Sequence, residues 1–269
     1  MPNWCMNKLN VKGDADVITE FIETILVPKE DESGFVGIEP FFDEGKYREL
    51  TPSDEVDFSR VYPMPEILQG SRSPAIRKED VQKAIDDPDH WNHKDSDNYK
   101  AGEWFDEMLL LAEKGEQAKK ETGFDNWYDW AWQHWGTKWS PDVELIEAVQ
   151  HFDNTGGLTI EVYFEYETAW SPCQGIINAM AEKFPKLKFV ESYDEPGIGF
   201  YGSACYKNGN QIADICEDYD DTPELQAFTE KYGSDPEESI VSEDEFYETQ
   251  NEVICTVRDK VTDRVKALL

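Results

Sequence analysis

Basic residues are scarce in this sequence. It has 25 lysines and arginines against 58 aspartates and glutamates, so the 269-residue chain carries a formal net charge of −33. A surface this negative repels phosphate backbones and anionic membranes, and it attracts cations and basic protein surfaces. The composition therefore argues against direct binding to nucleic acid or to a membrane.

Long apolar runs, paired cysteines and targeting signals are missing as well. No apolar stretch approaches the roughly 20 residues that cross a bilayer, and the first residues show neither the basic region nor the apolar core of a secretion signal. The five cysteines are widely spaced and form no Cys-x-x-Cys pair, which argues against a zinc site and a disulfide framework. We therefore expect a cytoplasmic protein with reduced thiols.

Catalytic signatures are also absent from the sequence. It has no Gly-x-Ser-x-Gly elbow around a nucleophilic serine. The run Trp135-Gly-Thr-Lys138 lacks the Gly-x-x-x-x-Gly-Lys-Ser/Thr frame of a phosphate-binding loop. His90 and His93 lie beside several aspartates, but two histidines in a polar loop are more often exposed than metal-bound. We predict no catalytic residue, no metal and no cofactor, and the sequence favours a protein that is not an enzyme.

Aromatic residues, by contrast, are plentiful, with 9 Trp, 12 Tyr and 14 Phe. Disordered acidic chains are poor in aromatic residues because they have no core to fill. The sequence therefore predicts a folded protein whose surface carries an excess of charge.

The apolar periodicity predicts two blocks of strands and helices. The first block is a strand, a helix and a strand, at residues 3–11, 14–26 and 35–42. The second block is a strand, a helix, a strand and a hairpin, at residues 158–166, 171–184, 187–193 and 198–217. The dipeptide Asn208-Gly209 is the signal for the hairpin turn.

Together the two blocks predict an α+β fold, a ferredoxin-like antiparallel sheet with helices on one face. The core would comprise residues 1–213 with a helical insertion at about 45–155, and an acidic helical extension, residues 214–269, would pack on it. We place a helix at residues 141–152, because apolar residues recur at every third position from Val143 to Phe152.

The strand at 158–166 alternates most clearly. Its apolar residues predict a buried face, and Glu161, Tyr163 and Glu165 predict a polar one. RNA-recognition sheets need aromatic residues and basic flanks on their open face. The two glutamates therefore argue against direct RNA binding.

Several short runs carry a family resemblance. They are Met1-Pro-Asn-Trp-Cys-x-Asn-x-Leu-x-Val-x-Gly13, Tyr62-Pro-Met-Pro-Glu66, Asn126-Trp-Tyr-Asp-Trp130, Trp135-Gly-Thr-Lys-Trp139, Thr168-Ala-Trp-Ser-Pro172 and Phe184-Pro-x-Leu-x-Phe189. With these runs, in order over residues 1–206, the chain resembles the YubB-like proteins of bacteriophages and conjugative plasmids. The resemblance implies a ferredoxin-like domain, a mobile-element origin and residence in the cytoplasm of a bacterial host. It implies no activity, and the acidic segment after Asp214 lies outside it.

The acidic segment supplies the first functional hypothesis. Residues 214–248 hold 14 acidic residues and one basic residue, Lys231, which is more charge than solubility requires. We expect an acidic face that binds the basic, nucleic-acid-facing surface of a host protein, as a DNA mimic or an inhibitor of host defence. Adaptation to high salt and simple drift in a viral protein are the competing explanations. The predicted partner-binding residues are Asp214, Glu217, Asp218, Asp220, Asp221, Glu237, Glu238, Glu243, Asp244 and Glu245.

A tryptophan-rich cleft is the alternative hypothesis. Aromatic rings stack on bases, so an enzyme or a nucleotide-binding protein could use such a cleft. Tryptophans that only fill the core are the structural explanation for the same residues. The predicted ligand-binding residues are Trp135, Thr137, Lys138, Trp139 and Trp170.

Overall fold

The computed structural model describes residues 3–30, 36–37, 41–43, 46–47, 55–87, 89–90, 103–152 and 157–269. The chain forms two compact units, one of Met1–Tyr62 with Trp139–Leu269 and one of Pro63–Lys138. In the described part of the chain, every helix is too short or too polar to cross a bilayer.

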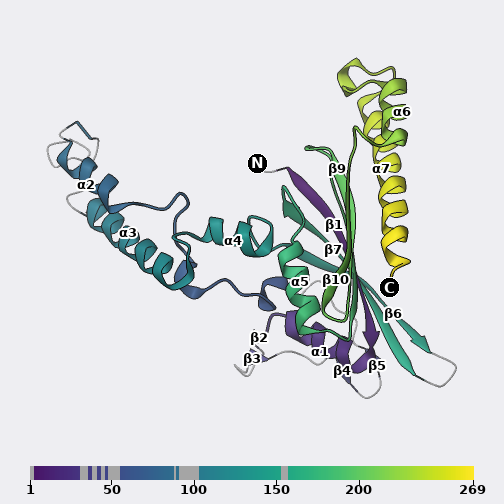
Figure 1. Ribbon diagram of the computed structural model, residues 1–269, viewed down its shortest axis with the longest axis horizontal. Coiled ribbons are helices and arrows are strands. Elements are labelled where there is room, and N and C mark those ends of the chain that lie inside the picture. Colours follow the sequence, from purple (N-terminus) through teal and green to yellow (C-terminus); the bar gives the residue numbers. More distant parts are fainter. Residues whose placement is uncertain are drawn as a thin grey trace. The chain divides into compact units, whose positions relative to one another are not determined.

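The larger unit is built on a six-stranded antiparallel sheet with the order β10-β9-β8-β1-β7-β6 (Figure 1). Its strands are β1 (Trp4–Asp14), β6 (Asp142–Phe152), β7 (Leu158–Ala169), β8 (Lys188–Glu195), β9 (Phe200–Lys207) and β10 (Asn210–Asp218). The chain runs through β1, helix α1 (Ala15–Ile25), β6, β7, helix α5 (Gln174–Lys183) and β8, which is the ferredoxin-like succession. The predicted fold class is confirmed, and the hairpin of β9 and β10 widens the sheet beyond β8.

One face of the sheet packs on α1 and α5. The helical period of α1 begins after Asp14, and the buried residues of the helix are Ile18, Phe21, Ile22 and Ile25. Phe21 lies edge-on to Phe164, Phe184 and Phe189, with ring centroids 6.2, 5.4 and 5.8 Å away. The main apolar core therefore lies between these two helices and the sheet.

The other face of the sheet carries the C-terminal helices, α6 (Pro223–Tyr232) and α7 (Glu243–Lys266) (Figure 1). Neighbouring residues of a strand point to opposite faces, so Phe189 faces α1 and Val190 faces α7. Helix α7 lies along β8, β9 and β10. Buried apolar side chains on this side include Val190, Tyr201, Cys205, Leu225, Ile254, Val257, Val261 and Val265.

The predicted helix at residues 141–152 is wrong, because these residues form the edge strand β6, paired with β7. The register shifts between Leu145 and Glu147, as in a β-bulge. Val143 therefore lies opposite Tyr166, and Val149 lies opposite Glu161 on the other face. The three-residue spacing of apolar residues does not mark one face of a helix, and long-range pairing decides the conformation.

The predicted strand at residues 35–42 is not a strand of the main sheet. Two-residue strands β2 (Lys29–Glu30) and β3 (Val36–Gly37) pair with each other, as do β4 (Phe42–Asp43) and β5 (Lys46–Tyr47). Phe35 and residues 38–40 lie outside the described residues. The second strand of the ferredoxin-like succession is β6, which follows the smaller unit in sequence.

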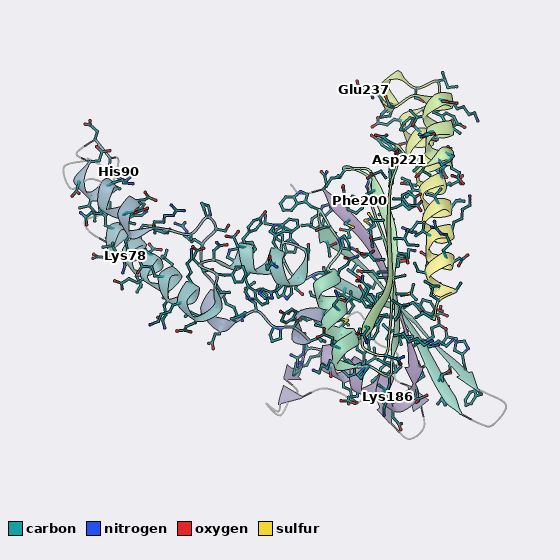
Figure 2. The ribbon with its side chains drawn as sticks, viewed as in Figure 1. Lys78, His90, Lys186, Phe200, Asp221 and Glu237 are labelled. Atoms are coloured by element: carbon teal, nitrogen blue, oxygen red, sulfur yellow. The ribbon has the colours of Figure 1, made fainter. Side chains whose placement is uncertain are left out.

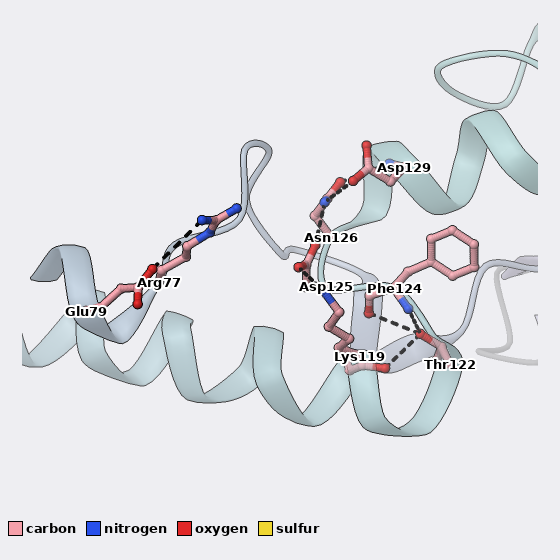
Figure 3. Close-up of polar contacts among 9 residues, drawn as sticks. Arg77, Glu79, Lys119, Thr122, Phe124, Asp125, Asn126 and Asp129 are labelled. Carbon is pink, nitrogen blue, oxygen red and sulfur yellow. Dashed lines mark hydrogen bonds and ion pairs between the residues drawn. The ribbon is translucent and has the colours of Figure 1, made fainter.

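The smaller unit is helical in its described part. Its helices are η2 (Glu66–Leu68), α2 (Lys78–Asp86), α3 (Glu103–Thr122) and α4 (Trp127–Trp135), and two short helices of the larger unit are η1 (Phe58–Arg60) and η3 (Pro236–Glu238). Val81 packs against Phe105 and Met108 between α2 and α3. The side chain of Asn126 caps α4 by accepting a hydrogen bond from the backbone N–H of Asp129 at 2.9 Å; Figure 3 shows this segment.

Candidate functional site

The predicted tryptophan site is divided between the two units. Trp135, Thr137 and Lys138 belong to the smaller unit, and Trp139 and Trp170 belong to the larger one. Trp135 and Thr137 are buried, and Trp135 lies edge-on to another indole of α4 with centroids 5.3 Å apart. These two side chains therefore have a packing role in the smaller unit.

Two of the predicted acidic residues are held by contacts within the protein. Asp214 accepts hydrogen bonds from the Tyr193 hydroxyl at 3.2 Å and from Gln174 Nε2 at 3.3 Å. Glu217 accepts a hydrogen bond from the Tyr201 hydroxyl at 2.8 Å and pairs with Arg264 at 2.8 Å. The bond from Tyr201, followed by that from Arg264, lowers the pKa of Glu217. These two acidic residues of β10 thus connect the strand to α5, β8, β9 and α7.

The other described acidic residues project into solvent. We define the C-terminal acidic surface by its residues, which are Asp218, Asp220, Asp221, Glu237, Glu243, Asp244 and Glu245. Within the described part of the chain, none of them lies within ion-pair distance of a basic side chain. Figure 2 shows Asp221 beside the end of the sheet and Glu237 at the far end of the α6–α7 hairpin. The side chain of Glu238 lies outside the described residues.

Three of these acids also have a local structural cause. Glu243, Asp244 and Glu245 form the first turn of α7, where negative charge interacts favourably with the helix dipole. Ser242 caps the same turn by accepting a hydrogen bond from the backbone N–H of Glu245 at 3.3 Å. Asp218, Asp220 and Asp221 do not lie in the first turn of a helix.

A groove that sequence reasoning missed runs between α7 and the exposed half of the sheet. Its main hollow has a volume of about 840 Å³, and a second hollow of about 280 Å³ shares Lys8 and Glu165 with it. We call the two hollows together the sheet groove. Met6, on β1, and Ile254, on α7, give the main hollow an apolar part, and Met6 is 42% exposed. The alternation of residues in β7 predicted the polar strand face that forms the floor of the groove. It did not predict that α7 forms a wall of the groove.

Carboxylates of β6 and β7 face each other along this groove. Asp142 lies directly opposite Glu167, and Glu144 lies directly opposite Glu165. All four line the main hollow, where Lys8 pairs with Glu165 at 2.7 Å. Like charges directly opposite each other destabilise a sheet. Repulsion between the facing carboxylates of the groove therefore lowers the stability of the folded protein.

Replacing Glu144 with lysine tests that cost. The lysine would lie opposite Glu165, so the free energy of unfolding should rise by about 0.2–1 kcal/mol, measured by urea denaturation at low salt. The control is Glu230→Lys on the exposed side of α6, which makes the same change of net charge at a position with no acidic residue three or four places away. An equal gain in both variants would show that general repulsion, and not the facing pair, is responsible.

A buried ion pair stands at the helix side of the groove. Arg258, on α7, pairs through Nη1 with Asp194, on β8, and both side chains are 8% exposed. Burial raises the pKa of Asp194, and the charge of Arg258 opposes that rise. The pair links α7 to β8 through two charges that are largely desolvated.

The comparison with protein families concerns the part of the chain that holds β7, α5, β8, β9, β10 and α6. Residues 150–235 match the family model described as the ferredoxin-like domain in Api92-like protein. The chain is similar to Api92-like proteins through this domain, which runs from the end of β6 through α6. The crystal structure of a protein api92 from Yersinia pseudotuberculosis is similar at 14% identity over 83% of this chain and 100% of that one, with a TM-score of 0.33. No curated protein matches the chain.

The segment that matches this family model contains a buried carboxyl group on the α5 side of the sheet. Glu191, on β8, is 0% exposed and accepts a hydrogen bond from the Tyr166 hydroxyl at 2.6 Å, while its Oε2 has no hydrogen-bond partner in the described part of the chain. Burial raises the pKa of Glu191 to about 7. Burial and the charge of Glu191 also raise the pKa values of the Cys5 and Cys173 thiols, so neither is a ready thiolate nucleophile.

Proposed function

We propose that this protein is a non-enzymatic interaction protein whose C-terminal acidic surface binds a basic surface of a partner protein. The observation that carries the proposal is the exposure of these carboxylates without basic partners in the described part of the chain. The nearby basic residues Arg264 and Lys260 are bound to other acids, Glu217 and Glu224. The acidic surface is thus left open to charges from outside the molecule.

The counterpart with the best chemical match is a surface built for nucleic acid. Carboxylates on a strand end, a turn and two helix ends are held by a folded scaffold, so their separations are set before binding, as are those of duplex phosphates. Such a surface gains affinity by releasing counterions, as nucleic acid does. The protein would act as a DNA mimic or as an inhibitor of a host defence protein. The resemblance to YubB-like proteins, with its implied mobile-element origin and bacterial cytoplasm, supports this role.

The test is a pull-down from bacterial lysate with the wild-type protein and with the variant Asp218→Asn, Asp220→Asn, Asp221→Asn. We expect the wild type to retain basic nucleic-acid-binding proteins at low salt and to release them at high salt. Duplex DNA should compete for the same proteins. The variant should retain them about tenfold more weakly, because three charge contacts of up to about 0.5 kcal/mol each are lost.

The matched control removes three charges from helix α3, with Asp106→Asn, Glu107→Gln and Glu121→Gln. It has the same net charge as the first variant and should retain partners like the wild type. The proposal fails if both variants lose binding equally, because net charge alone would then explain retention. It also fails if the retained proteins are indifferent to salt and to duplex DNA.

A further inference from the structure

The sheet groove differs from the C-terminal acidic surface in position and in form. It is a hollow with a helix as one wall and strands as its floor, and seven residues of α7 line it: Asn251, Ile254, Cys255, Arg258, Asp259, Thr262 and Lys266. At about 1.5 Å of rise per residue, the span from Asn251 to Lys266 makes the groove about 22 Å long. An extended chain of about seven residues covers that length.

Charges are matched at one end of this sheet face and unmatched at the other. Outside the groove, Glu161 on β7 contacts Lys12 at 3.0 Å and His151 at 3.2 Å. Inside it, Lys8 forms an ion pair with Glu165. The remaining carboxylates on β6 and β7 in the main hollow have no basic partner in the described part of the chain, and they are Asp142, Glu144 and Glu167. Glu161 thus has basic partners where the sheet face forms no groove.

Two further features of the groove indicate a polypeptide occupant. Arg258 is buried and lines the main hollow, yet its Nε has no hydrogen-bond partner among the described residues. An extended chain brings backbone carbonyls, which are acceptors for such a donor, and one of them reaches this buried Nε only when the Arg258 side chain shifts. Met6 and Ile254 offer apolar contact beside the carboxylates. In the described residues, no group of acidic, histidine or cysteine side chains is placed to hold a metal ion.

We propose that the sheet groove binds an extended, basic segment of a partner protein. The acids form two cross-strand pairs, which we call rungs, two residues apart along the strands. One rung is Glu167 with Asp142, and the next is Glu165 with Glu144. Successive rungs are about 6.8 Å apart, which is the spacing of alternate residues in an extended chain. The segment therefore carries lysine or arginine at every second position, and the apolar residues between them face α7, where Ile254 offers apolar contact. This inference does not rest on the proposed function, since it uses none of the C-terminal acidic surface.

The probe is a fluorescent peptide of about seven residues with alternating lysine and valine. Fluorescence anisotropy should show saturable binding to the full-length protein at low salt. The variant Asp142→Asn, Glu144→Gln, Glu167→Gln should weaken it at least about tenfold, because charged contacts in a partly enclosed groove are worth more than exposed ones. The variant Asp218→Asn, Asp220→Asn, Asp221→Asn should bind the peptide like the wild type. A peptide with glutamate in place of lysine should not bind.

Two exposed cysteines locate the bound peptide. Cys255 lies in the groove, and Cys216 lies on β10 outside it. Bound peptide should slow the alkylation of Cys255 by maleimide and leave that of Cys216 unchanged. The proposal is overturned if both thiols are protected alike, if the two triple variants weaken binding equally, or if the peptide does not bind. Self-association of the free protein that the groove variant abolishes would also overturn it, by making a second copy the occupant.

Discussion

Replacing Arg258 with methionine is expected to lower the free energy of unfolding by about 3–5 kcal/mol, because it leaves a buried carboxylate without its counter-charge. Methionine keeps the aliphatic stem of the arginine, so packing between α7 and the sheet changes little. The burial that raises the pKa of Asp194 would then act unopposed by Arg258. The loss should be measured by urea denaturation at neutral pH, and it should shrink as the pH falls and Asp194 takes up a proton.

The matched control for this prediction is Arg264→Met on the same helix. Arg264 pairs with Glu217 at 2.8 Å, but the two side chains are 59% and 37% exposed. Exposed pairs contribute about 0–1 kcal/mol, so this variant should stay close to the wild type. If both variants lose the same free energy of unfolding, the loss does not come from leaving the buried charge of Asp194 unpaired. The double variant Asp194→Asn, Arg258→Met should recover part of the loss, since no charge remains buried.

Replacing Glu191 with glutamine is expected to remove a pH dependence of stability. The folded state holds the pKa of Glu191 at about 7, above the ordinary value of 4.5, so the folded protein keeps a proton that the unfolded chain releases in this window. Wild-type stability should therefore fall as the pH rises from about 4.5 to about 7 and should not fall further above it because of this group. Relative to the variant, the fall should amount to about 3 kcal/mol, measured as the difference between two pH series of denaturation curves.

Glu217→Gln separates this effect from general repulsion. Hydrogen bonds from Tyr201 and Arg264 lower the pKa of Glu217, so its contribution is lost only as the pH falls below the ordinary range of a carboxyl group. Between pH about 5 and 8 this variant should follow the wild-type slope. The assignment to Glu191 is wrong if Glu191→Gln keeps the wild-type slope in that window.

Local signals were sufficient for much of the fold. The stripe of α1, the alternation of β7 and the turn at Asn208-Gly209 each lie within a few residues, and the structure has a helix, a strand and a hairpin at these places. Asn208 and Gly209 have φ values of 54° and 77°, the left-handed conformations that favour asparagine and glycine. Asn7, a polar residue on the buried side of β1, donates hydrogen bonds to Thr168 Oγ1 and to the Cys5 carbonyl, both at 2.8 Å.

Long-range pairing set the rest of the fold. Residues 141–152 have apolar spacing that suits a helix, yet hydrogen bonds to β7 make them a strand with a bulge. The groove depends on where α7 lies, and its position follows from buried contacts of Ile254, Val257 and Val261 with the sheet. No local pattern encodes which half of a sheet a helix will cover.

The sequence by itself determined the excess of negative charge, the aromatic core and the strands and helices whose periodicity is complete within one segment. Tertiary structure alone decided which charges are neutralised. Glu217 and Asp194 pair with arginines of α7, whereas Asp142, Glu144 and Glu167 lie directly opposite other carboxylates. The physical reason is that Coulomb energy depends on distance and burial, and both are fixed only when segments far apart in the chain pack together.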